Sequence, residues 1–185
     1  GNADGTSRLE GSVRSGEGAL AVDGRLNFRD ATAPLQLVLR GENVTLASTP
    51  ELYLIGTPEL TMRWLPDRLE LRGTLAVPEA RVDLEALDSS VSVSPDVVVI
   101  DPVDVASDRS RPLDMDFSVS LGDEVKLKGF GLDGAMTGSL RLRERLGRRA
   151  TALGTLQVSG KYRAYGQALT IQRARLSYAN VPFDN

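Results

Sequence analysis

The stretch Gly138-Ser139-Leu140-Arg141-Leu142 is one copy of a five-residue phrase: glycine, any residue, leucine, any residue, then an aliphatic, β-branched or aromatic side chain. The same phrase begins at Gly18, Gly24, Gly73 and Gly154. A β-strand directs alternate side chains to opposite faces, so each phrase places its glycine, its leucine and its last residue on one face. The residues between them are Ala, Arg, Asn, Thr, Ser or Gln. The phrase therefore predicts a sheet with one apolar and one polar face.

The same alternation continues outside the five phrases. Residues 112–121 are its clearest example, because every odd position is apolar and most even positions are Asp or Ser. Turn signals separate the alternating segments at intervals that an antiparallel meander requires. The predicted strands are 7–14, 18–29, 34–40, 43–47, 51–55, 59–65, 68–77, 80–85, 91–94, 97–100, 113–121, 124–128, 137–143, 152–163, 167–172 and 174–179.

The sequence shows no stripe of apolar residues with helical spacing. Residues 86–111 differ from the rest, because Ser, Asp and Pro interrupt short runs of Val. We expect a loop-like excursion there. Because the strand pattern resumes after it, we expect one β-groove domain over residues 1–185, as a fragment of a longer protein. No run approaches the ~20 apolar residues that a membrane-spanning helix needs, so we expect this fragment to be soluble.

An apolar sheet face must pack against another element or bind a ligand that shields it from water. Without an amphipathic helix, three solutions remain: a second sheet, closure into a barrel, or one sheet folded into a trough. We predict a mainly β fold in which a long antiparallel sheet curls into a concave trough with a hydrophobic interior. The lining residues expected from the alternation are Leu20, Val22, Leu26, Phe28, Leu35, Leu37, Leu39, Leu60, Met62, Trp64, Leu69, Leu71, Leu75, Val77, Leu113, Met115, Phe117, Val119, Leu140, Leu142, Leu156, Val158, Leu169, Ile171, Leu176 and Tyr178.

Composition argues against several functional classes. The 185 residues include no histidine and no cysteine, and the net charge is −3. Without histidine no Ser-His-Asp triad can be assembled, and without cysteine there is no disulfide or thiolate metal site. The charge and the lack of a basic stripe give no reason to expect nucleic acid. We therefore expect no enzyme activity, no catalytic residue, no metal and no cofactor.

Two motifs are weighed against simpler interpretations. Residues 129–134 match the dinucleotide fingerprint G-x-G-x-x-G, but the residues that follow read as a strand rather than the helix the fingerprint requires. A glycine-rich bend between strands is favoured. Asp114 and Asp116 are spaced like a carboxylate pair for acid–base chemistry. Alternation places both on the polar face, so solvated surface is favoured over catalysis.

Two charge clusters remain. Asp96, Asp101, Asp104 and Asp108 lack the spacing of a calcium loop, so calcium binding is disfavoured. Five arginines gather near one expected hairpin tip, where a solvated turn is favoured over contact with anionic head groups or an acidic partner. They are Arg141, Arg143, Arg145, Arg148 and Arg149.

Two stretches resemble the C-terminal region of the TamB family. One covers residues 154–171 with 173–176 and 184–185 after it, and includes Gly-x-Tyr-x-Ala-Tyr-Gly-Gln at 160–167. The other covers residues 34–43, with 49–52 after it. The resemblance implies a periplasmic protein of a diderm bacterium, anchored in the inner membrane by a helix outside this sequence. It also implies a greasy β-trough carrying phospholipids towards the outer membrane, and an Omp85-type outer-membrane barrel partner linked to autotransporter assembly.

Two functions follow from the predicted sheet. The first is passive conduction of phospholipid acyl chains, because each buried CH₂ contributes ~0.8 kcal/mol and a uniform Leu and Val lining gives little positional preference. The second is a scaffold that pairs with unfolded outer-membrane β-proteins, or with an Omp85-type partner, through exposed strand edges. The first uses the face and the second uses the backbone edge.

Overall fold

The computed structural model describes residues 6–27, 29, 35–91, 112–146, 148 and 150–182. Within these ranges, ten strands form one sheet, and one short helix lies between the sixth and seventh strands. The elements are β1 Thr6–Ser15, β2 Gly18–Asn27, β3 Leu35–Glu42, β4 Val44–Ser48, β5 Leu52–Trp64, β6 Leu69–Asp83, α1 Leu84–Val91, β7 Leu113–Gly129, β8 Leu132–Glu144, β9 Thr151–Ala164 and β10 Gln167–Pro182. The prediction of a mainly β protein with an open sheet is confirmed.

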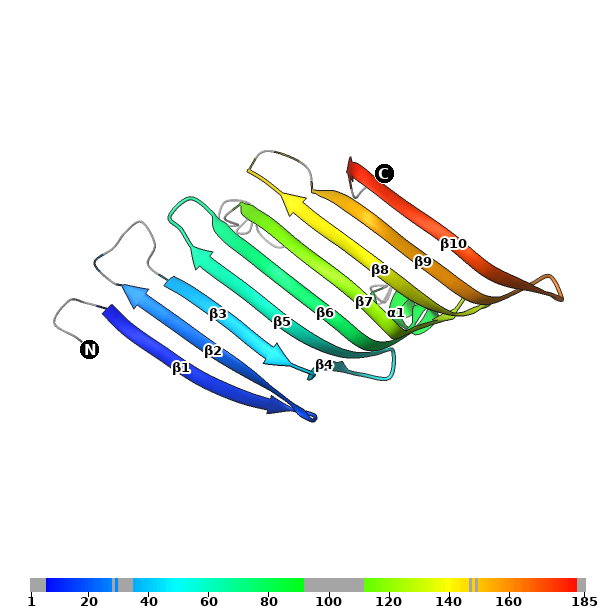
Figure 1. The fold of residues 1–185 in the computed structure, drawn as a ribbon, viewed down its shortest axis with the longest axis horizontal. Coiled ribbons are helices and arrows are strands. Elements are labelled where there is room, and N and C mark those ends of the chain that lie inside the picture. Colours follow the sequence, from blue (N-terminus) through cyan, green and yellow to red (C-terminus); the bar gives the residue numbers. More distant parts are fainter. Residues whose placement is uncertain are drawn as a thin grey trace, which may run out of the picture.

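The strands follow the chain in the order β1-β2-β3-β5-β6-β7-β8-β9-β10, with β1 and β10 at opposite edges (Figure 1). Strand β4 pairs with β5 beyond the point where β3 stops, so β3 and β4 flank the same side of β5 in succession. Asn43 separates them with a φ of 49°, a left-handed conformation that asparagine tolerates.

One strand pair contradicts the predicted antiparallel meander. Strands β6 and β7 run parallel, with Leu69 opposite Leu113 and Val82 opposite Leu127. Parallel neighbours need a crossover connection of a dozen or more residues, usually with a helix, whereas antiparallel ones need only a tight turn. The segment interpreted as a loop-like excursion provides this crossover between the two strands.

The helix at the start of this crossover was not predicted. Asp83 ends β6 and accepts a hydrogen bond from the Ala86 N–H through its Oδ1, at 3.0 Å, so it acts as the N-cap of α1. Eight residues are too few to show a 3.6-residue stripe. The predicted strand at 80–85 therefore stops at Asp83, and the one at 91–94 is wrong at Val91, which ends the helix. The predicted strand at 97–100 lies outside the described residues.

Several predicted strands are continuous in the structure. Segments 51–55 and 59–65 join as β5, 68–77 and 80–85 as β6, 113–121 and 124–128 as β7, and 167–172 and 174–179 as β10. In β5, β6 and β7 each junction holds a register shift, at Ile55/Thr57, Val77/Glu79 and Leu121/Lys126. Such bulges bend a strand without ending it, and the long strands are visibly bent in Figure 1.

A cluster of buried apolar residues lies beside these bulges. Val77, Ala80 and Val125 are 3–4% exposed and form a cluster. Leu54, Leu75, Val119, Leu121 and Met136 pack against it from β5, β6, β7 and β8. The cluster therefore joins neighbouring strands on the apolar side of the sheet, beside the bulges.

Candidate functional site

The strand registers place one row of apolar residues across almost the whole sheet. Direct partners lie on the same face, and the row passes from Gly11 in β1 to Ala152 in β9. Its members in spatial order are Gly11, Val22, Leu39, Leu60, Gly73, Phe117, Leu142 and Ala152. At a strand spacing of about 4.8 Å, the eight strands that carry this row span about 34 Å.

Parallel rows on the same face account for the other predicted lining residues. One row passes through Leu26, Leu35, Trp64, Leu69 and Leu113, a second through Leu37, Met62, Leu71 and Met115, and a third through Leu75, Val119, Leu140, Gly154 and Tyr178. Leu20 pairs with Val13 in β1. A fourth row passes from Val77 in β6 through Leu121 and Gly138 to Leu156 and Leu176. Further along β9 and β10 the apolar face holds Val158, Ile171 and Leu169. Phe28 lies outside the described residues.

The structure adds residues to this face that the sequence pattern missed. In β6 the bulge after Val77 reverses the alternation, so Ala80 and Val82 follow on the apolar face. Their partners Leu54, Val125 and Leu127 lie beside them. The signal in the sequence was Pro78, where the alternation changes phase.

The glycines of the repeated phrase let neighbouring strands approach closely. Gly138 stands opposite Leu156, and Gly154 stands opposite Leu140, so two copies of the phrase pair with each other. A Cβ on Gly154 would lie 2.2 Å from the Ser139 carbonyl oxygen, and one on Gly138 would lie 2.2 Å from the Thr155 carbonyl oxygen. Both have φ values that glycine adopts without strain, 145° and 125°. Glycine there is a backbone requirement.

Ion pairs connect strands on the opposite, polar face. Arg72 Nη2 lies 2.7 Å from Asp114 Oδ1, and Arg141 binds both oxygens of Asp116 at 2.6 and 2.7 Å. This bidentate hydrogen bond from Arg141 lowers the pKa of the Asp116 carboxyl below its usual value. Arg143 Nε lies 3.4 Å from the same carboxylate. Asp114 and Asp116 are thus partners of arginines that link β6, β7 and β8.

The remaining sequence motifs are also placed. The G-x-G-x-x-G stretch contains the Phe130-Gly131 turn between β7 and β8, so no helix follows it. Arg141 and Arg143 belong to β8, Arg145 and Arg148 lie in the connection to β9, and Arg149 is outside the described residues. Asp96, Asp101, Asp104 and Asp108 are outside them too. Across the described ranges, no group of three or more Asp or Glu residues is arranged to hold a metal ion.

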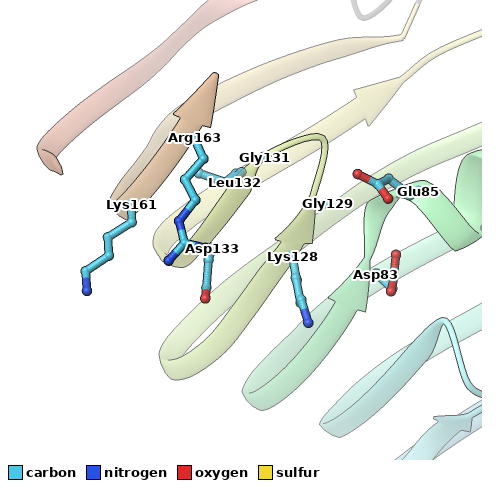
Figure 2. Close-up of a pocket in the computed structure, with 9 residues that line it drawn as sticks. All are labelled: Asp83, Glu85, Lys128, Gly129, Gly131, Leu132, Asp133, Lys161 and Arg163. Atoms are coloured by element: carbon cyan, nitrogen blue, oxygen red, sulfur yellow. The ribbon is translucent and has the colours of Figure 1, made fainter. Parts of the chain in front are cut away.

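A pocket of about 230 Å³ lies at the end of β7, β8 and β9. Its charged lining alternates across the strands, because Asp83 pairs with Lys128, Lys128 with Asp133, and Asp133 with Lys161. Figure 2 shows Lys128, Asp133, Lys161 and Arg163 extending to the same side of the ribbon. These positions belong to the polar face, so the pocket is separate from the apolar rows.

The fold and its surfaces define an open-sheet β protein that presents one extended apolar face. In the part of the chain that the structure describes, no helix has the length and apolarity needed to cross a membrane. The chain belongs to the TamB family, because residues 7–185 match the family described as the TamB C-terminal domain.

A curated relative supports this membership. The translocation and assembly module subunit TamB of Haemophilus influenzae is 24% identical over 192 residues, which cover 95% of this chain. The chain spans 15% of the length of that relative. No solved structure matches the chain.

Proposed function

We propose that the apolar face is a groove that conducts phospholipid acyl chains through the periplasm of a diderm bacterium, as part of outer-membrane assembly. The observation that carries this proposal is the row of apolar and glycine residues from Gly11 to Ala152. An acyl chain needs continuous apolar contact without hydrogen-bonding groups, and each buried CH₂ contributes ~0.8 kcal/mol. Polar side chains stand on this face at strand ends, as Ser7 does opposite Leu26 and Glu144 opposite Met115.

The exposure of the face supports ligand binding over a sealed core. Few of the described apolar residues expose less than a tenth of their surface, and three of them, Val77, Ala80 and Val125, form the cluster at the bend. Large apolar side chains elsewhere on the same face remain exposed, including Trp64 at 41%, Leu169 at 55% and Leu176 at 46%. Apolar surface of this extent marks a site for lipid or protein.

Membership of the TamB family supports the wider setting. The Haemophilus relative is described as a translocation and assembly module subunit. From the resemblance we infer an inner-membrane anchor elsewhere in the full-length protein, and an Omp85-type barrel as the outer-membrane partner. In this setting the groove shields lipid tails from water while head groups stay at its open side.

Site-specific photocrosslinking in living cells tests conduction against the scaffold alternative. The crosslinker is placed at Leu75 or Phe117 on the apolar face, with Ala76 and Ser120 as controls, because these two residues pair with each other on the polar face. We expect phospholipid adducts at Leu75 and Phe117 and none at the controls. Polypeptide adducts at Leu75 and Phe117 without lipid adducts would contradict the proposal.

The structure gives less support to the scaffold alternative. Strand β10 lies at one edge and is 16 residues long, which suits strand addition. Its ladder with β9 is interrupted by register shifts at Ile171/Ala174 and Ala179/Val181. Bulges of this kind blunt an edge against regular pairing, so the face is the favoured site.

A further inference from the structure

Two hairpin turns at the same end of the sheet carry aromatic residues. Phe130-Gly131 joins β7 to β8, and Tyr165-Gly166 joins β9 to β10. The φ values are 49° and 83° in the first pair and 51° and 76° in the second, so both turns have the positive φ values of type I′. The two turns are neighbours, because the Arg163 N–H donates a 2.8 Å hydrogen bond to the Gly131 carbonyl (Figure 1).

Folding does not explain these aromatic residues. The first position of a type I′ turn favours Asn, Asp or Gly, and a bulky side chain there is strained. Burial does not compensate for the strain, because Phe130 is 58% exposed and Tyr165 is fully exposed at 104%. The same unfavourable choice occurs in both turns, which points to a ligand that contacts them together.

Basic side chains lie beside the two turns. Lys161 and Arg163 precede Tyr165 on β9, and Lys128 precedes Phe130 on β7. The pocket also holds three carboxylates, but two of them accept backbone hydrogen bonds: Asp83 from the Ala86 N–H, and Glu85 from the Phe130 N–H. Figure 2 shows these two apart from Lys161 and Arg163. Asp133 is the carboxylate that lies opposite Lys161 on the neighbouring strand.

We propose that this end of the sheet, defined by Phe130, Tyr165, Lys161 and Arg163, docks on the surface of a phospholipid bilayer. The amphipathic Tyr ring is favoured at the level of the head groups, an apolar Phe ring is favoured just below them, and Lys or Arg beside these rings attract lipid phosphates. The two rings stand at the tips of the turns, with the cations behind them on the strands. Docking goes beyond acyl-chain conduction and does not depend on it, because it needs only the two turns and the cations beside them.

Flotation of the 185-residue chain with vesicles tests docking. The vesicles contain phosphatidylethanolamine and phosphatidylglycerol, or phosphatidylcholine alone. The double variant Phe130→Asn, Tyr165→Asn places the favoured residue type in both turns, so its thermal unfolding temperature should be equal to or above that of the parent chain. We expect its binding to both kinds of vesicle to fall about tenfold, because both rings leave the interface.

A charge variant and a distant control complete the test. Lys161→Gln with Arg163→Gln should weaken binding to the phosphatidylglycerol vesicles by about fivefold per cation, and this loss should shrink at high salt. Leu146→Asn, at the opposite end of the sheet, should bind like the parent chain, although Leu146 is 45% exposed. Undiminished binding by the folded aromatic variant would overturn the proposal. Failure of the parent chain to bind protein-free vesicles would also overturn it and favour a protein partner.

Discussion

Gly154→Ala tests whether the repeated glycines set the spacing of the strands. The new Cβ would lie 2.2 Å from the Ser139 carbonyl oxygen and 3.0 Å from the Leu140 Cα. The first distance is more than about 1 Å short of ordinary contact between heavy atoms. Both neighbours are backbone atoms, so no side-chain rotation relieves the overlap, and β8 must move away from β9.

Two terms give the size of the effect. The φ of 145° found for Gly154 lies outside the backbone regions that alanine favours. Holding alanine there costs about 1–2 kcal/mol. Weakening the adjacent ladder hydrogen bonds adds about 1 kcal/mol. A total of about 2–3 kcal/mol lowers the unfolding temperature of a chain of this size by about 4–12 °C.

Thermal unfolding monitored by far-ultraviolet circular dichroism measures this loss. Gly11→Ala is the matched control, because a Cβ at Gly11 meets no atom within 4 Å. That variant should be as stable as the parent chain or more stable by up to about 1 kcal/mol, since alanine loses less backbone entropy than glycine. Equal unfolding temperatures for the two variants would refute the close-approach explanation.

Two further predictions concern charge on the two faces of the sheet. Asp116→Asn should lower the free energy of unfolding by no more than about 1 kcal/mol, because the Arg141 pair is partly exposed. The native pKa of Asp116 is lowered, so this contribution is present above the unfolded pKa, about 3.9, and is lost as the pH falls through the native pKa. Urea titrations of the parent chain and the variant at pH 7 and below pH 4 measure the contribution. A stability difference between the two proteins that grows in acid would contradict this sign. Leu75→Asp should lower the free energy of unfolding by about 2 kcal/mol, because Leu75 packs against the cluster of Val77 at the bend. Ala76→Asp, on the polar face, should change it by less than about 0.5 kcal/mol. Equal losses of stability in urea unfolding would exclude a difference between the faces.

The alternation predicts the faces of the sheet because side-chain direction is a local property of a strand. Residues 112–121 show this, since Leu113, Met115 and Phe117 share the face that their spacing predicts. The alternation also places the glycines of the phrase on the correct face, but it does not explain why glycine is required there. At four of the five positions, Gly18, Gly73, Gly138 and Gly154, the requirement comes from carbonyl groups of neighbouring strands, which the sequence around each glycine does not contain.

The crossover and the bulges depend on contacts between distant segments. Strand β6 pairs with β7 in parallel across 42 or more residues of sequence, for example Arg72 with the Asp114 side chain, and the alternation is identical for parallel and antiparallel neighbours. The phase change at Pro78 is visible in the sequence as the end of one strand and the start of another. The structure shows that the strand continues, because residues beyond Pro78 still pair with β7, as Ala80 does with Val125.

A labelling scan of β6 with lipids that carry a doxyl quencher tests the central claim most directly. The chain has no cysteine, so a fluorophore can be placed at one introduced cysteine at a time, at positions 69, 70, 71, 72, 74, 75, 81 and 82. The account predicts quenching at 69, 71 and 75 and little at 70, 72 and 74, followed by a change of phase, with quenching at 82 and little at 81. Equal quenching at all positions, or an alternation that keeps its phase past Pro78, would contradict an apolar face that binds lipid along the bent strand.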